Sequence, residues 1–423
     1  MSYRKIMANM PSTWSRIQVL NENSRNERLG KSVDAEVMSS QLGYLSWTSL
    51  TFIGVMLLST LKAVGAETLA DALLAVSSIL MAGSVIYNQG LRKSLGATGF
   101  FFILLTSIYL TWTIISPSVI GVKNTIGVLI SAAVFFYFVS KANDAVRSSN
   151  VPTFLIGGAL VVTAAGHISQ GVAKNTLSGL VAYPILAAGA ILVSRNPKRA
   201  NLISTCIFMS VTLIAFSLDH RALAGLGAVG IVTYYLCQFA PSSIVKYGIL
   251  ITLAASIFGL IALYTGILGF DISVFNEIFV NYTGRNAVSG RQIIWPIIIS
   301  YVSQSPWFGL GSGATFSQLY ASEWSAHSYY IQVYMQTGIF GLSVLIALMV
   351  SIWKSIGKIR RRDPLSCYAT SVFALLLIHM SLEVFLMQTN LMIGFGAWMA
   401  VGLCVGLLRI PDRKLKRRLR IKI

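Results

Sequence analysis

Long apolar segments follow one another along most of this chain, separated by short polar connections. A helix needs about 20 mostly apolar residues to cross the hydrocarbon core of a bilayer. By that criterion the chain contains a dozen spans, of which the fifth is short. They lie at 44–62, 69–88, 97–116, 122–140, 151–166, 177–194, 200–217, 222–239, 244–269, 328–352, 365–387 and 390–409. The pattern predicts an all-α polytopic membrane protein with about 12 transmembrane helices.

Composition supports the same class of protein. Hydrophobic residues make up 55% of the chain and charged residues 11%, and the mean hydropathy is +0.70. Soluble globular domains carry about twice that share of charged residues. A soluble enzyme or binding module is therefore excluded.

One polar stretch interrupts the apolar pattern, after the ninth span. We expect a large periplasmic loop with short interfacial helices at 270–327, where any chemistry is to be sought. The other predicted parts are a cytoplasmic segment at 1–43, helices 1–9 in 44–269, helices 10–12 in 328–409 and a basic cytoplasmic tail at 410–423.

The basic residues predict the orientation. With both termini cytoplasmic, all but six of the 33 Lys and Arg residues fall in cytoplasmic segments, as the positive-inside tendency requires. Topology and attraction to anionic lipids then account for most of the net charge of +19, without a nucleic-acid partner. The six exceptions are Lys62, Lys123, Lys174, Arg221, Arg285 and Arg291.

Arg291 lies at the predicted start of a short helix in the loop. The apolar run 293–302 is too short to cross a bilayer, which suggests a helix lying along the interface with Ser289 near its cap. Free backbone amides at a helix start, together with a guanidinium, form an anion site. The alternative is an arginine that meets lipid phosphate. Arg285 is a weaker candidate of the same kind.

Arg221 lies in the very short connection after the seventh span. An arginine kept on the outer side against the positive-inside tendency is a candidate for binding an anion. The alternative is a surface residue whose charge is balanced by Asp219.

His327 immediately precedes the tenth span. A helix start and nearby arginines both disfavour the imidazolium, so the ring is expected to be neutral and able to accept a proton. Glu323 is a candidate to orient it. The alternative is a histidine hydrogen-bonded at the membrane interface, which is also our interpretation of His167 and His220.

Three alternating glycines, Gly309, Gly311 and Gly313, follow Pro306 in the same loop. Glycine permits positive φ and close backbone approach, which suits wrapping a phosphate or a sugar ring. The same spacing also suits a tight return of the chain.

His379 and Glu383 lie four residues apart in the eleventh span, where a helix would present them on one face. Such a pair suits a proton relay or, as we favour, a polar clasp between helices. Carboxylates are sparse on the outer side and no histidines cluster at ligand spacing, so neither a metal site nor another cofactor is predicted.

These residues resemble the shared core of bacterial O-antigen ligases and Wzy-type O-antigen or exopolysaccharide polymerases. The resemblance covers roughly residues 200–350. It rests on Ser289-Gly290-Arg291 with Trp295, Pro306-x-x-Gly309-x-Gly311-x-Gly313, His327 with Tyr330, and Gly338-x-x-Gly341. Two positions depart from the family pattern: Ser328 stands where asparagine is frequent, and His220-Arg221-Ala222 replaces a frequent Ser-Arg-Gly.

The resemblance implies a multi-pass glycosyltransferase of the bacterial inner membrane. It would act without a metal on glycan carried by undecaprenyl diphosphate and pass it to a glycan or lipid A-core acceptor. Arg221 and Arg291, with Arg285 as a weaker third, would bind the diphosphate. His327 would be the catalytic base of an inverting transfer, and Gly309, Gly311, Gly313 and Tyr330 would form the substrate loop.

Within this family a polymerase of exopolysaccharide or O-antigen repeat units is favoured, and an O-antigen ligase is the alternative. A polysaccharide or lipid-linked sugar transporter is the alternative from another class. It would depend on His379 and Glu383 and would show paired halves with interrupted helices, which the sequence does not indicate. A cell-wall glycosyltransferase using a loop aspartate would leave His327 without a role. A membrane scaffold would not explain the clustered arginines and histidine.

Overall fold

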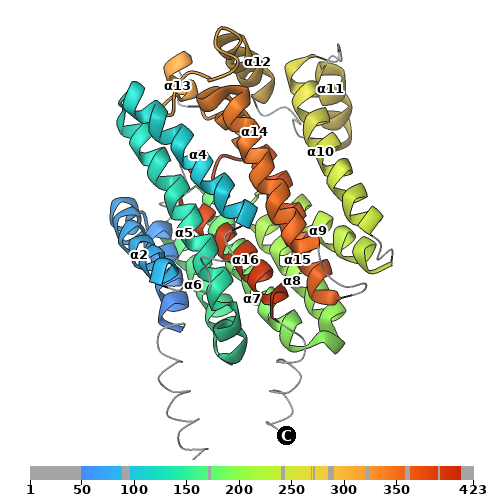
Figure 1. Cartoon of the computed structure of the whole chain (residues 1–423). Coiled ribbons are helices and arrows are strands. Elements are labelled where there is room, and N and C mark those ends of the chain that lie inside the picture. Colours follow the sequence, from blue (N-terminus) through green and yellow to red (C-terminus); the bar gives the residue numbers. More distant parts are fainter. Residues whose placement is uncertain are drawn as a thin grey trace, which may run out of the picture. The chain divides into compact units, whose positions relative to one another are not determined.

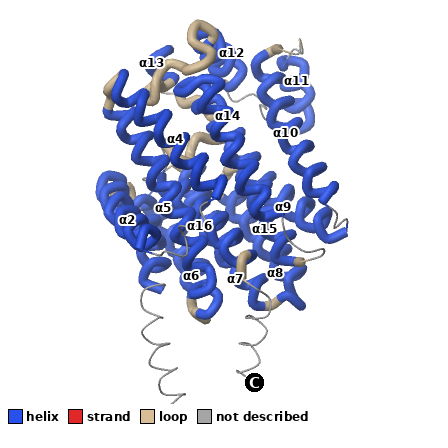
Figure 2. The backbone as a smooth tube through the Cα atoms, in the orientation of Figure 1, coloured by secondary structure: helices blue, strands red, loops and turns tan. Residues whose placement is uncertain are grey.

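The computed structural model describes residues 49–87, 96–169, 173–239, 243–267, 269, 272–283, 290–320, 324–357, 363–388 and 391–410. Within these ranges all regular secondary structure is helical, and turns and loops connect the helices (Figure 2). Eleven of the helices are long and apolar enough to cross a membrane. The prediction of an all-helical, multi-pass membrane protein is confirmed.

The long helices follow the predicted spans closely, which reflects the strength of the apolar pattern. The first predicted span, 44–62, begins outside the described residues, and its described part belongs to the shorter helix Ser49–Ala63. The eleven are α2 (Glu67–Tyr87), α4 (Gly96–Ile115), α5 (Val119–Arg147), α6 (Val151–Ser169), α7 (Lys174–Arg195), α8 (Ala200–Ser217), α9 (Arg221–Phe239), α10 (Ser243–Thr265), α14 (Tyr329–Gly357), α15 (Pro364–Leu382) and α16 (Leu391–Leu408).

Three short helices occupy the predicted loop: α11 (Ile272–Thr283), α12 (Arg291–Val302) and α13 (Phe316–Leu319). Of these, α12 packs against α10, α13 and α14. Figure 1 shows α12 and α13 beside the first turns of α14. This packing places the start of α12 next to His327, which immediately precedes α14.

The unit Phe52–Ile423 is built around α7, α15 and α16. In α16, 94% of the most apolar stretch is buried, against 11% in α10. The central α16 packs against α5 and α7, while α15 packs against α9. Large apolar side chains such as Leu213 on α8 and Ile251 and Phe258 on α10 are exposed instead, as expected for surfaces that face lipid tails.

Polar contacts join helix ends on the side of the membrane that the charge pattern predicts to be cytoplasmic. Arg195, at the end of α7, donates to the carbonyl oxygens of Val146 at 2.8 Å and Ala145 at 2.9 Å. There it satisfies carbonyls that have no partner within α5 and meets the negative end of that helix. Lys246 Nζ similarly donates to Ser366 Oγ at 2.7 Å, joining the start of α10 to the start of α15.

On the other predicted side, the outer basic residues Lys62 and Lys123 pair with acids. Lys62 lies 3.3 Å from Glu67 and 3.8 Å from Asp71, and Lys123 lies 3.5 Å from the other oxygen of Asp71. These contacts balance the charge of Lys62, which is almost fully buried.

The membrane helix α14 is interrupted at Gly338, whose φ of 63° and ψ of −162° are not helical. A break in a buried helix leaves backbone groups without helical partners. Here the loop Pro306–Gly311 supplies the partners. The amides of Leu310 and Gly311 donate to the carbonyls of Met335 and Gln336 at 2.8 and 3.1 Å, and those of Ile339 and Phe340 donate to the carbonyls of Pro306 and Trp307 at 2.8 and 3.1 Å.

Glycine is required where the loop and the broken helix meet. A Cβ at Gly309 would overlap the backbone of Gly338, and a Cβ at Gly338 would overlap the backbone of Trp307. A side chain at Gly313 would likewise overlap Ser118, which caps α5. The glycine pattern suited either the wrapping of a phosphate or sugar ring or a tight return of the chain. The structure displays the tight return.

Buried amide side chains hold the loop in this position. Gln332 and Gln336, both on α14, each donate to the carbonyl of Ala314 at 3.1 Å. The Gln336 side-chain oxygen accepts from Tyr109 of α4 at 2.9 Å and from Gln388 at 2.6 Å. The loop is thus joined by hydrogen bonds to the interior of the helical bundle.

We predict that Gly338→Ala destabilises the protein by at least about 2 kcal/mol, because the backbone region it occupies is essentially restricted to glycine and the added methyl group meets the Trp307 backbone. Thermal unfolding in detergent measures the effect. Gly259→Ala in α10 is the matched control, since a Cβ there has no neighbour within 4 Å. Equal melting temperatures for the two variants would contradict the docking.

Candidate active site

The candidate active site is organised by two side chains one turn apart on α12. Arg291 donates from Nε to the carbonyl of His327 at 3.3 Å and from Nη2 to the carbonyl of Leu382 at 2.6 Å. Trp295, fully buried, donates from Nε1 to the carbonyl of Ala326 at 2.7 Å. Positions four apart share one helix face, so α12 holds the segment before α14 and the end of α15 together.

His327 lies at the point where these contacts meet. Its backbone has a φ of +47°, a conformation that is uncommon for residues other than glycine and that marks candidate functional positions. The imidazole Nδ1 lies 3.8 Å from Glu383 Oε2, longer than a direct hydrogen bond but close enough for strong electrostatic interaction. Its side chain is 35% exposed, so the ring remains accessible.

The partner of His327 is Glu383, which the sequence pattern placed elsewhere. The predicted span 365–387 would have put Glu383 on a helix face shared with His379, but α15 ends at Leu382. Glu383 is the extended C-cap residue of that helix. This end of the helix turns the carboxylate toward His327, a contact between residues 56 positions apart that no local pattern predicts.

The electrostatics of Glu383 are set by its neighbours. Burial alone raises the pKa of the carboxyl, but the interaction with His327 and the nearby His379 and His220 outweigh it, so the pKa lies below its ordinary value. The group is therefore a carboxylate near neutral pH, placed to stabilise positive charge on His327.

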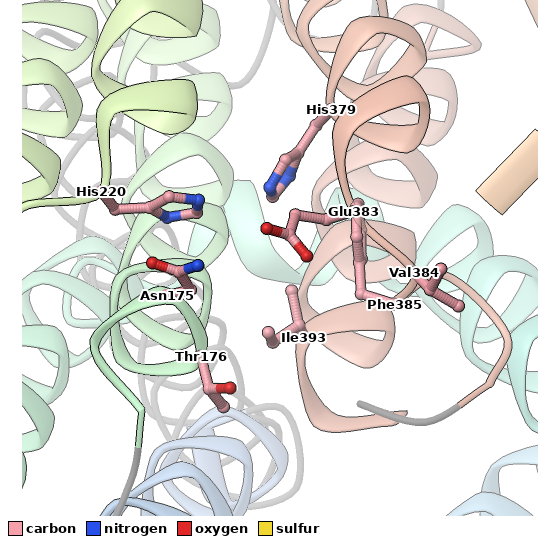
Figure 3. Close-up of a pocket in the computed structure, with 8 residues that line it drawn as sticks. All are labelled: Asn175, Thr176, His220, His379, Glu383, Val384, Phe385 and Ile393. Carbon is pink, nitrogen blue, oxygen red and sulfur yellow. The ribbon is translucent and has the colours of Figure 1, made fainter. Parts of the chain in front are cut away.

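A cavity opens on the other side of Glu383, between α7, the start of α9 and the end of α15. Cavity and mouth together enclose about 320 Å³. Figure 3 shows the side chains of His220, His379 and Glu383 converging on the same space. The lining residues are Asn175, Thr176, His220, His379, Glu383, Val384, Phe385 and Ile393.

Both cavity histidines are anchored through Nδ1 and leave Nε2 without a partner. His220 Nδ1 is hydrogen-bonded to Ser178 Oγ, and His379 Nδ1 lies 2.8 Å from the hydroxyl of Tyr183. The Nε2 atoms of His220 and His379 are buried and have no hydrogen-bond partner. Buried polar atoms without partners are rare in folded proteins, so they indicate a site that receives another group.

The other predicted site residues are distributed as follows. Arg221 begins α9, directly after His220, but its side chain lies outside the described part of the structure. Arg285 and Glu323 also lie outside the described residues. Tyr330 is buried and donates to the carbonyl of Leu377 at 3.1 Å, so its hydroxyl holds α14 against α15.

Sequence reasoning missed His220 and the pairing of His327 with Glu383. The available signal for His220 was its place beside Arg221, in a connection too short to form a separate surface loop. The signal for Glu383 was its charge near the end of an apolar span, where an ionisable residue is a functional candidate. Neither signal indicates which other residue is the partner.

Among the described side chains, no group of three or more His, Cys, Asp or Glu residues is arranged to hold a metal ion. The residues around His327 instead provide a guanidinium, a carboxylate and an imidazole. Such a set can bind an anion and move a proton.

No known protein-family model matches this chain, and no curated protein matches it significantly.

We predict that the folded protein loses stability as the pH falls below about 6.5, the ordinary pKa of histidine. Burial lowers the pKa of His220, an effect that Glu383 partly offsets. The unfolded state therefore binds the proton first, and stability declines as the pH falls from that value toward the lower folded pKa. Melting temperatures measured between pH 7.5 and 5 should fall less for His220→Gln than for the control His167→Ala. Identical slopes of melting temperature against pH in the two variants would contradict the lowered pKa of His220.

Proposed function

We propose that this protein is a glycosyltransferase of the bacterial inner membrane that transfers glycan from an undecaprenyl-diphosphate carrier to a sugar hydroxyl. The observation that carries the proposal is the grouping of Arg291, His327 and Glu383, two of which the family resemblance had singled out. The membrane-spanning helices around them suit a substrate whose lipid tail stays in the bilayer.

In the proposed reaction His327 Nε2 takes the proton from the acceptor hydroxyl. The hydroxyl oxygen then forms a bond to the anomeric carbon from the face opposite the carrier, and the bond between that carbon and the diphosphate oxygen breaks. Inversion at the anomeric carbon follows. Glu383, beside Nδ1, stabilises the imidazolium that forms, as a carboxylate does beside other catalytic histidines.

Positive charge near His327 would stabilise the departing diphosphate without a metal. Arg291 supplies a guanidinium there, while two of its N–H groups position the main chain of His327 and Leu382. It thus has a positioning role in addition to the proposed anion contact. We assign Arg221, which begins α9, the second diphosphate contact that the family resemblance implies.

One departure from the family pattern has a simple physical basis. Ser328, which stands where asparagine is frequent, is the residue before α14, and its hydroxyl accepts from the amide of Ile331 at 3.5 Å. Serine and asparagine are both preferred at the start of a helix. The substitution therefore preserves the start of α14 next to His327.

We favour polymerisation of exopolysaccharide or O-antigen repeat units as the form of the reaction. The reason is that the compact Gly-Arg-x-x-Ile-Trp and Pro-Trp-x-Gly-x-Gly segments resemble those of exopolysaccharide polymerases. The alternative is an O-antigen ligase that passes finished polymer to lipid A-core. The two differ in the acceptor and share the chemistry at His327.

A transporter of polysaccharide or lipid-linked sugar is the second candidate, favoured by the buried His220 and His379 beside Glu383 and by the interruption of α14. In transporters, however, the freed backbone groups of broken helices contact the substrate or ion. In α14 the groups beside Gly338 are occupied by the loop Pro306–Gly311. We therefore favour the transferase.

We predict that His327→Ala lowers glycan transfer by at least about 100-fold, the smaller contribution expected of a positioned general base. The measurement uses purified protein in lipid nanodiscs with lipid-diphosphate-linked repeat units as donor and acceptor. His167→Ala is the matched control, because His167 is an exposed histidine at the end of α6 that does not line the cavity. Equal transfer by the two variants, both folded, would remove the proposed base.

A deletion strain separates the remaining alternatives. A single repeat unit left on the core indicates a polymerase, whereas long chains left on the lipid carrier indicate a ligase. Purified protein that moves lipid-linked glycan across vesicles without forming a glycosidic bond would support the transporter and contradict the transferase.

A further inference from the structure

The two buried histidines of the cavity differ in the hydrogen-bonding role of their free nitrogen. Ser178 has one hydroxyl hydrogen, which it donates to the carbonyl of Asn175 at 2.8 Å. With that hydrogen bond made, the Ser178 oxygen accepts from His220 Nδ1–H. In the neutral ring the other nitrogen, His220 Nε2, then carries a lone pair and no hydrogen. This network assigns His220 Nε2 as an acceptor within the cavity.

The opposite assignment applies to His379. The hydroxyl of Tyr183 is buried, and its hydrogen-bond partner is His379 Nδ1 at 2.8 Å. A buried hydroxyl hydrogen without an acceptor is costly, so Tyr183 donates to Nδ1. The hydrogen of the neutral His379 ring is then on Nε2, which makes Nε2–H a donor within the same cavity.

An acceptor and a donor without partners thus lie in one buried space. The ring centroids of His220 and His379 are 5.9 Å apart. One hydroxyl group, which both donates and accepts, satisfies both nitrogens at once. A carbonyl or an ammonium satisfies only one of them. The pair therefore fits a hydroxyl group of a ligand, or a water molecule in its place.

The rest of the cavity indicates what carries that hydroxyl. The cavity opens to solvent through a mouth, and the two together enclose about 320 Å³. The carboxylate of Glu383 disfavours an anion. Asn175 and Thr176 line the same cavity and offer further hydrogen bonds.

We propose that this cavity binds a neutral sugar ring of the acceptor glycan, with one ring hydroxyl held between His220 Nε2 and His379 Nε2. The inference rests on the proposed transferase function and names the place of the acceptor. Glu383 borders the cavity and also contacts His327, so a ring bound there lies beside the proposed base.

The test measures binding of a lipid-free probe, the single repeat-unit oligosaccharide released by mild acid from the host's lipid-linked precursor. Saturation-transfer NMR on the full-length protein in nanodiscs measures its Kd. We expect His220→Ala and His379→Ala to weaken binding about tenfold, the effect of losing a hydrogen bond of about 1.4 kcal/mol. His220→Gln keeps an acceptor and should restore part of the affinity, while the control His167→Ala should bind as the unaltered protein does.

The outcomes separate this inference from the proposed function. Unchanged Kd values in folded His220 and His379 variants would mean that the cavity holds only water, and the acceptor site would be refuted. Absence of probe binding together with transfer that depends on His327 would also refute it, leaving the transferase intact. Absence of both binding and transfer would refute the transferase as well. Should the alanine variants not fold, His379→Gln and Thr176→Ala provide the same comparison.

Discussion

Backbone groups inside a membrane have no water to bind, and this constraint governs the structure around the candidate site. The interruption of α14 at Gly338 frees amides and carbonyls within the bundle, and the loop Pro306–Gly311 binds them in turn. The loop, which is apolar and rich in glycine, is therefore anchored in the protein interior. This anchoring joins the segment between α12 and α14 to the helices that carry the rest of the site.

On α12, polar side chains likewise bind backbone groups of other segments. Arg291 and Trp295 bind main-chain carbonyls on either side of the strained His327 backbone and at the end of α15. A charged residue in this setting has two effects, since it orders the chain and leaves positive charge beside the imidazole. Loss of Arg291 would therefore disturb both the position of His327 and any bound diphosphate.

Polar side chains cluster at one end of α7, α9 and α15, in two groups with Glu383 between them. One contains His327, which is partly exposed, and the other contains the buried His220 and His379. The proposed division of roles is that the first performs the proton transfer and the second positions the sugar that supplies the hydroxyl.

The sequence by itself determined the class of protein and the approximate places of the long helices, because burial in lipid requires long apolar segments that are visible locally. It also singled out Arg291 and His327, since a charged or polar residue at a span end stands out against apolar neighbours. Only the tertiary structure decided that Glu383 leaves its helix to meet His327, that His220 shares a cavity with His379, and that Gly309 packs against Gly338. These contacts join residues far apart in the chain, and their energies depend on distances and burial that no local pattern encodes.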